Sequence, residues 1–190
     1  MKKMKTLFER VFEEHGRQCT DKVTEGCEWV LNEPCVATRK FDGTCCLIEN
    51  NKIYRRFDYK AGRTLPVGAI PCQEKADEVA GHFPHWVLCD ENNPADKWHI
   101  KAFESQKPLK DGTYELCGEH FQNNIDKMTE SGDVLVKHGW MVQEGDFSSY
   151  EAIKSYLENH YIEGIVFYRA NGDMCKIKRS DFGFEWGKKR

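Results

Sequence analysis

The clearest folding signal in this sequence lies near its carboxyl end, in the turn Ala170-Asn171-Gly172-Asp173. The dipeptide Asn-Gly is a strong signal for the tight turn of a β-hairpin. The runs on either side, 164–168 and 174–178, have the apolar, strand-like character of hairpin arms. We therefore predict an antiparallel hairpin here, and a fold that contains an antiparallel sheet.

Other segments show the same strand character. A hairpin turn is expected at 49–52, where Glu49-Asn50-Asn51-Lys52 separates two apolar runs. Residues 60–84 contain three prolines and three glycines and are expected to form mainly a loop, with one short helix at 73–80. The predicted strands cover residues 28–31, 35–39, 44–48, 53–57, 85–89, 113–117 and 133–138.

Three helices are expected outside that loop. The first lies in the opening segment, where Leu7, Phe8, Val11 and Phe12 recur at helical spacing, and it ends at His15-Gly16, a glycine C-terminal signal. The second runs from about 94 to about 105. A Ser-x-x-Glu capping box, Ser148 to Glu151, predicts the start of a third helix that ends near 159. The sum of these elements indicates one α+β domain dominated by antiparallel strands.

Composition places the chain among globular proteins. A length of 190 residues suits one domain, and 39% apolar with 31% charged residues excludes wholesale disorder. The absence of a long apolar run or a signal-peptide core predicts an intracellular, cytoplasmic protein without membrane partners.

Charge is unevenly distributed along the chain. The net charge of −3 excludes a generally basic nucleic-acid coat. Two stretches are nevertheless basic, and a polyanion would bind there. The alternative for either stretch is a strand edge protected by solvated charges. The basic residues are Lys52, Arg55, Arg56, Lys60 and Arg63 in the first stretch, and Lys176, Lys178, Arg179, Lys188, Lys189 and Arg190 in the second.

The chain has nine cysteines but no Cys-x-x-Cys pair. Paired Cys-x-x-Cys units are the usual mark of a structural zinc site, and an odd count fits a disulfide framework poorly. We therefore expect free thiols, several of them buried on strands, with the doublet Cys45-Cys46 as strand packing. A metal or redox protein built on these cysteines is the alternative.

Lys40 is the candidate nucleophile. It lies where one predicted strand ends, and Gly43 allows the backbone to approach a ligand closely. A lysine amine attacks only when unprotonated, which requires desolvation or neighbouring cations. Lys176 and Lys178, two residues apart on one strand, share a face and could supply those cations while binding a triphosphate. The alternative is an ordinary solvent-facing strand.

Two glutamates could complete such a site. Glu163 lies just ahead of the partner strand of the final hairpin, where a carboxylate could hold a divalent metal that orients an α-phosphate. Glu115 lies on a strand that ends in glycine and could accept hydrogen bonds from ribose hydroxyls.

These residues fall into a pattern that resembles the covalent nucleotidyltransferases, the superfamily of polynucleotide ligases and mRNA capping enzymes. The similar segments come in the family's order across residues 38–178. They are Lys40-Phe41-Asp42-Gly43 (motif I), Arg55-Arg56-Phe57-Asp58 (Ia), Tyr114-Glu115-Leu116-Cys117-Gly118 (III), Leu135-Val136-Lys137-His138-Gly139 (IIIa), Glu163-Gly164-Ile165-Val166-Phe167 (IV) and Lys176-Ile177-Lys178 (V). Within the superfamily, the chain is similar to 5′-to-3′ ATP-dependent RNA ligases of viruses and eukaryotes.

The resemblance implies a minimal nucleotidyltransferase (ATP-grasp-like ligase) domain of antiparallel sheets flanked by helices. Since only residues 179–190 follow the last motif, no OB-fold domain is expected. The implied reaction uses ATP and Mg²⁺ or Mn²⁺ to form a lysyl-N-AMP, passes AMP to an RNA 5′-phosphate, and seals the RNA when a 3′-hydroxyl displaces AMP. Such an activity would serve RNA repair.

The resemblance also assigns roles. Lys40 would be the nucleophile, Glu163 would serve the metal or position Lys40, and Lys176 and Lys178 would bind the α-phosphate. Asp42 and Gly43 belong to the nucleotide-binding motif I, and Glu115 would bind ribose hydroxyls and is a second candidate metal ligand. Backbone groups near Thr38 and Arg39 would read the adenine edge. Adenine would lie between Ile165 or Phe167 and His138 or a valine. Arg56 would contact the ribose or RNA phosphate, and the expected RNA-binding residues are Arg55, Arg56, Lys60, Arg63 and Arg179.

Three other interpretations compete with an RNA ligase. One is a different covalent nucleotidyltransferase, either a minimal DNA ligase or a guanylyltransferase that uses GTP. Another is a binding protein that kept the nucleotide pocket and lost turnover. The third is the metal or redox protein based on cysteines.

Overall fold

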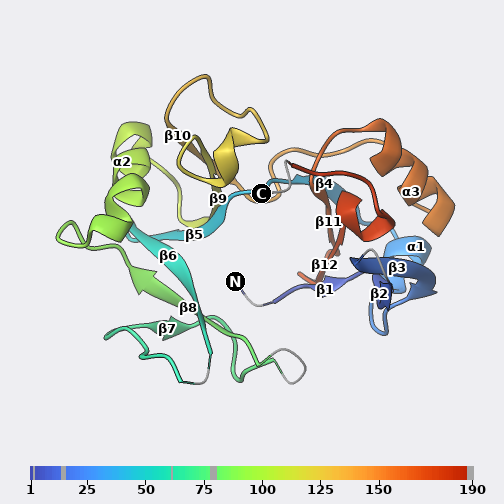
Figure 1. Ribbon diagram of the computed structural model, residues 1–190, viewed down its shortest axis with the longest axis horizontal. Helices are drawn as coiled ribbons and strands as arrows, with labels where there is room; N and C mark the ends of the chain where they lie inside the picture. The colour runs from blue at the N-terminus through green and yellow to red at the C-terminus, as the bar shows by residue number, and fades with distance from the viewer. Residues whose placement is uncertain (2, 14–15, 61, 78–80, 188–190) are drawn as a thin grey trace. The chain divides into compact units, whose positions relative to one another are not determined.

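Strands make up most of the regular structure of the chain (Figure 1). The computed structural model describes residues 1, 3–13, 16–60, 62–77 and 81–187. They form a mixed α/β protein with mostly sheet and a few helices, which agrees with the α+β prediction. They divide into two compact units, one made of residues 1–3 and 42–138 and the other of residues 4–41 and 139–190. The expected single domain stays a prediction.

The first unit contains a six-stranded sheet with strand order β10-β9-β5-β6-β8-β7. Its pairs are antiparallel throughout. Helix α2 (Lys97–Gln106) contacts β6 and β10 and buries Ala102 and Phe103 against Ile48, Ile53 and Leu116 (Figure 1). The strands are β5 (Thr44–Glu49), β6 (Lys52–Tyr59), β7 (Ile70–Pro71), β8 (Phe83–Leu88), β9 (Gly112–Gly118) and β10 (Asp133–Lys137), with short 3-10 helices at Pro94–Asp96 and Gln122–Asn124.

The second unit contains a four-stranded sheet with strand order β1-β12-β11-β4. β1 runs parallel to β12, and the other pairs are antiparallel. Its apolar core includes Ile153 and Leu157 of α3 and Ile165, Phe167 and Ile177 of the sheet. The elements are β1 (Lys5–Thr6), β2 (Phe8–Glu13), β3 (Gly16–Val23), α1 (Trp29–Asn32), β4 (Val36–Lys40), α3 (Tyr150–Asn159), β11 (Gly164–Tyr168), β12 (Met174–Lys178) and a 3-10 helix at Arg179–Phe182.

The hairpin that opened the sequence argument is confirmed as β11 and β12, with Gly164 opposite Lys178. The strands predicted from 35–39, 44–48, 53–57, 85–89, 113–117 and 133–138 are also confirmed within one or two residues, as β4, β5, β6, β8, β9 and β10. The helix predicted from about 94 to 105 appears as a 3-10 turn followed by α2.

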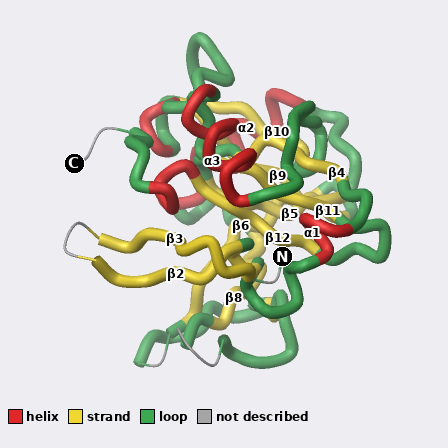
Figure 2. Tube along the Cα trace, turned by 90° about the vertical axis from the view of Figure 1, so that its right-hand side faces the viewer, coloured by secondary structure: helices red, strands yellow, loops and turns green. Residues whose placement is uncertain are grey.

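The helix predicted at 7–12 is wrong. This segment forms β2, which lies beside β3 in a two-stranded antiparallel sheet (Figure 2). Val11 and Phe12, expected on a buried helix face, are 40% and 81% exposed. Valine and phenylalanine fit a pleated strand well, and pairing with β3 outweighs helical spacing. Of the expected stop signal, Gly16 instead begins β3, and His15 lies outside the described residues.

The strand predicted at 28–31 is also wrong, because residues 29–32 form the short helix α1. Its first two residues, Trp29 and Val30, are buried in the core of the second unit. The Trp29 indole donates a hydrogen bond to the carbonyl of Gly26 (3.1 Å), which holds the segment in a turn. A four-residue apolar run does not by itself distinguish a strand from a helical turn.

The third helix begins one residue later than its predicted capping box. Ser149 is the N-cap, and its hydroxyl accepts a hydrogen bond from the backbone N–H of Ala152 (3.2 Å). Ser148 instead donates its hydroxyl to Asp146 (2.7 Å). The helix predicted at 73–80 is not formed by residues 73–77, and residues 78–80 lie outside the described residues.

No helix among the described residues combines the length and the apolar character needed to cross a membrane.

Candidate functional site

The sheet of the second unit places three lysines on one face. In the antiparallel register, Gly164 of β11 lies opposite Lys40 on β4 and opposite Lys178 on β12, and Val166 lies opposite Lys176. Directly opposed residues point to the same side of a sheet, as do residues two apart. The predicted shared face of Lys176 and Lys178 is therefore confirmed, and Lys40 joins it.

Glu163 is the centre of this group. Its side chain is 2% exposed, and each carboxylate oxygen accepts a hydrogen bond from a different ammonium group. Lys40 Nζ donates to Oε2 at 2.6 Å, and Lys178 Nζ donates to Oε1 at 2.5 Å. Lys40 Nζ also donates to the carbonyl of Phe41 at 3.2 Å. The carboxylate thus fixes the position of the candidate nucleophile.

Gly164, which follows this glutamate, has a steric reason to be glycine. A Cβ atom at this position would lie 2.2 Å from the carbonyl oxygen of Ile177 on β12. A larger residue would push β11 and β12 apart and with them the carboxylate and its lysine partners.

Lys176 has an altered affinity for its proton. Burial is the main cause, and the positive charges of Lys40 and Lys178 act in the same direction, so that the pKa of Lys176 falls to about 8. Glu163 opposes this shift, and Arg10 reinforces it. Near pH 8 this amine therefore exists in both protonation states.

Two residues of this group were not predicted from the sequence. Asp181 is 4% exposed and accepts hydrogen bonds from the backbone N–H of Lys178 (2.9 Å) and from the Arg10 guanidinium (2.7 and 2.9 Å). Arg10 lies on β2, a segment that the sequence analysis assigned to a helix. Its contact with Asp181 was therefore not predicted. Asp181 lies three residues after Lys178, the last residue of motif V. This short separation could have indicated that Asp181 lies near the lysines.

The expected adenine-stacking residues on β11 need correction. Ile165 and Phe167 are both fully buried in the core of the second unit, on the face opposite to the lysines. Val166 points to the same face of the sheet as the three lysines, and its neighbours in register are Lys176 and Thr38. By strand periodicity Val166, itself 7% exposed, is the apolar motif IV side chain on that face.

Thr38 and Arg39 lie on β4. Thr38 is 1% exposed, and its hydroxyl donates to the carbonyl of Val166 (3.3 Å). The backbone N–H of Arg39 donates to the carbonyl of Met141 (2.8 Å), and its guanidinium lies 5.1 Å from the centre of the Phe41 ring. Their expected role in reading adenine through backbone groups stays a prediction.

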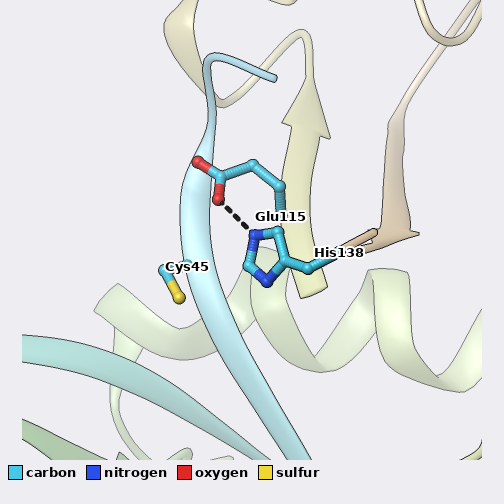
Figure 3. A group of neighbouring side chains, drawn as sticks. All are labelled: Cys45, Glu115 and His138. Atoms are coloured by element: carbon cyan, nitrogen blue, oxygen red, sulfur yellow. Dashed lines mark hydrogen bonds and ion pairs between the residues drawn. The ribbon is translucent and has the colours of Figure 1, made fainter. Parts of the chain in front are cut away.

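The first unit gathers a second set of predicted residues. Glu115 on β9 accepts a hydrogen bond from the backbone N–H of Gly43 (3.1 Å) and shares another with His138 Nε2 (2.9 Å) (Figure 3). Gly43 is required to be glycine, because a Cβ atom there would lie 2.2 Å from the carbonyl oxygen of Leu116. The backbone N–H of Asp42 donates to Asp126, which is 7% exposed and was not predicted (2.6 Å).

Cys45 lies beside Glu115 and His138 (Figure 3). One potential ligand atom from each of these three residues lies within 4.8 Å of the others. Burial and the nearby carboxylate raise the pKa of the Cys45 thiol to about 12. Its neighbour Cys46 is fully buried in the core of the first unit, as predicted for strand packing. Cys45 points to the opposite face, so the two thiols of the doublet lie in different surroundings.

The predicted RNA-binding arginines have structural partners. Arg55 pairs with Asp96, which is 1% exposed, at 2.6 Å, and Arg56 pairs with Asp58 at 3.1 Å. Arg179 donates to the carbonyls of Leu157, Glu158 and His160 at the end of α3. Lys60 and Arg63 are exposed. RNA binding by any of these residues stays a prediction, and the last two are the best placed for it.

No protein-family model matches this chain, and no curated protein is significantly similar to it. The functional argument therefore rests on the residues themselves. The second unit brings together Lys40, Glu163, Lys176 and Lys178, and the first unit brings together Gly43, Glu115 and His138.

Proposed function

We propose that this chain is an ATP-dependent RNA ligase that joins RNA 5′-phosphate and 3′-hydroxyl ends through an AMP adduct on Lys40. The observation that carries the proposal is the buried carboxylate of Glu163 bound by both Lys40 and Lys178, with Lys176 on the same face. A lysine on a solvent-facing strand needs no such arrangement. A lysine that must be held, desolvated and surrounded by cations does.

In the first step, the Lys40 ammonium transfers a proton to the carboxylate of Glu163, and the resulting amine attacks the α-phosphorus of ATP. A nitrogen–phosphorus bond forms and the bond to pyrophosphate breaks. The nitrogen, now bonded to phosphorus and positively charged, then releases one proton to solvent. Lys176 and Lys178, on the same sheet face as Lys40, would hydrogen-bond the phosphoryl oxygens as negative charge develops on them. One such donor contributes about 3 to 4 kcal/mol to transition-state stabilisation in comparable sites.

The second and third steps pass AMP from Lys40 to the RNA 5′-phosphate and then release it when the 3′-hydroxyl attacks. Glu115 and His138 keep the nucleoside-binding roles that the motifs assign to them. Val166 replaces Ile165 and Phe167 as the proposed contact to adenine. The exposed Lys60 and Arg63 are the proposed contacts to RNA phosphates.

Mg²⁺ or Mn²⁺ would neutralise the triphosphate and orient it for attack. These hard cations prefer oxygen ligands and commonly bind through substrate phosphates and water. Glu163 fits them poorly as a direct ligand, because both of its oxygens already accept hydrogen bonds from lysines at 2.5 and 2.6 Å. We therefore assign Glu163 to positioning Lys40 and expect the metal to be held mainly by ATP.

The test is incubation with labelled ATP or GTP and Mg²⁺, followed by a 5′-phosphorylated RNA or, separately, DNA with a 3′-hydroxyl end. We expect an acid-labile AMP adduct, adenylated RNA and sealed RNA. The Lys40→Arg variant should form none of them, whereas Lys137→Arg, at an exposed position on β10, should form them all. An adduct with GTP alone would indicate a guanylyltransferase, and sealing of DNA but not RNA would indicate a DNA ligase.

A further inference from the structure

The group of Cys45, Glu115 and His138 contains a thiol that the proposed ligase reaction does not use. Cys45 and Glu115 lie directly opposite each other on the antiparallel strands β5 and β9. His138 follows β10, and its backbone N–H donates to the carbonyl of Thr113 on β9 (3.1 Å). Three strands of one sheet thus hold a thiol, a carboxylate and an imidazole beside one another, as Figure 3 shows.

We propose that these three side chains bind one Zn²⁺ ion. Thiolate, imidazole and carboxylate are the ligands that zinc takes in proteins, whereas Mg²⁺ prefers oxygen alone. Neighbouring ligand atoms in a tetrahedral zinc site lie about 3.5 Å apart, given bond lengths of about 2.0 to 2.3 Å. The three atoms here lie within 4.8 Å of one another. Side-chain rotation that brings them about 1 Å closer completes the site.

Two contacts around the group support this assignment. The N–H of Gly43 binds the carboxylate of Glu115 at 3.1 Å and would hold it in place beside a metal. The second nitrogen of His138, Nδ1, is buried and has no hydrogen-bond partner among the described residues. Coordination of the cation through Nδ1 would give this buried nitrogen a partner.

On binding, the sulfur–zinc bond replaces the sulfur–hydrogen bond of Cys45, and the proton leaves to water. No oxidant or reductant takes part. With three protein ligands, the fourth tetrahedral position is left to water, as in zinc sites that remain open to a further ligand.

Cobalt(II) tests this site, because it takes the same ligands and gives visible and charge-transfer absorption. The full chain is titrated with Co²⁺ without ATP or RNA. We expect one equivalent to bind with a thiolate-to-cobalt band. Cys45→Ser should lose that band, and Cys35→Ser, which removes a half-buried thiol of the second unit, should keep it. Glu115→Gln and His138→Gln should each weaken Zn²⁺ binding at least tenfold.

X-ray absorption on the zinc-loaded, unmodified protein keeps the test independent of whether a variant folds. The expected spectrum has one sulfur at about 2.3 Å and nitrogen or oxygen ligands at about 2.0 Å. A spectrum without sulfur, or Zn²⁺ affinity that Cys45→Ser leaves unchanged, would overturn the proposal. Because neither measurement involves a nucleotide, either outcome leaves the proposed ligase reaction to its own test.

Discussion

A single carboxylate, Glu163, accepts hydrogen bonds from two lysines in the second unit, and a third lysine lies beside them with its pKa lowered to about 8. Concentrating positive charge in a partly buried place opposes folding and favours the binding of an anion. At the scale of the residue, this group therefore has the properties of a binding site whose function costs stability.

Replacing Lys176 by methionine should make the protein more stable at pH 7. Its pKa is about 8 in the folded protein and 10.5 when unperturbed, so the unfolded chain binds more protons between these values. Deprotonation of Lys176 should consequently raise the free energy of unfolding of the unmodified protein between about pH 8 and pH 10.5. The expected increase is on the order of 3 kcal/mol.

The measurement is the free energy of unfolding in urea at a series of pH values. Lys176→Met should show a higher value at pH 7 and lose most of the rise above pH 8. Lys137→Met, at an exposed position, is the matched control and should keep the rise. A Lys176→Met protein that is less stable at pH 7 would show that the amine is favourably paired.

At the scale of the element, the sequence predicted those parts whose signals are local. The turn at Asn171-Gly172 and the strand period of two were sufficient to find β11 and β12 and to place Lys176 and Lys178 on one face. Residues 7–12 were misassigned because their partner, β3, determines their structure, and a spacing pattern contains no information about pairing. The same limit hid Arg10, since its neighbours come from distant parts of the chain.

The assignment of β11 residues to faces shows a finer limit. The sequence resembled a motif around Glu163, but which side chains share the face of Lys40 depends on the register with β4 and β12. That register puts Val166 beside Lys176 and puts Ile165 in the core. Likewise, Asp126 binds the Asp42 backbone from a loop region whose sequence carried no signal for this contact.

Gly164→Ala should destabilise the hairpin and prevent adduct formation. Its new methyl group would lie 2.2 Å from a backbone carbonyl of β12, so the strands must separate. We expect a loss of about 3 kcal/mol or more in the free energy of unfolding, in the upper range for single substitutions. Gly172→Ala, in open space at the turn with φ of 91°, should cost only about 1 to 2 kcal/mol and keep the adduct. Equal losses in the two variants would contradict this account of Gly164.

Ser149→Ala tests the observed start of α3. Removing the hydroxyl that accepts the Ala152 N–H should lower the free energy of unfolding by about 1 kcal/mol. Ser148→Ala, one residue earlier, should cost clearly less, because Ser148 caps nothing in α3. The free energy of unfolding of both variants is measured by thermal or urea denaturation. A larger loss of stability in Ser148→Ala would show that Ser148 is the N-cap, as the sequence analysis predicted.

At the scale of the whole molecule, the chain builds two apolar cores from interleaved parts of its sequence. Residues 42–138 supply nearly all of one unit, and the other takes residues from both sides of that segment. Composition does not reveal this division, because no linker-like stretch marks either crossing point. Because the net charge is −3, the proposed binding of RNA would depend on local basic residues.

RNA binding should therefore be sensitive to salt through a few identifiable side chains. Lys60→Ala and Arg63→Ala should each reduce the slope of log affinity against log salt concentration by about 0.7 for single-stranded RNA. Lys110→Ala, another exposed position, should leave the slope unchanged. Fluorescence anisotropy across a salt series gives the slopes. An unchanged slope in the first two variants would remove this stretch from the proposed RNA contacts.

The most direct test of the central claim is to locate the AMP by tandem mass spectrometry after incubation with ATP and Mg²⁺. The account predicts one AMP per chain, on the peptide that contains Lys40 and bonded to its Nζ, with much less adduct in Glu163→Gln than in the unmodified protein. AMP on any other residue, or full adduct formation by Lys40→Arg, would contradict it.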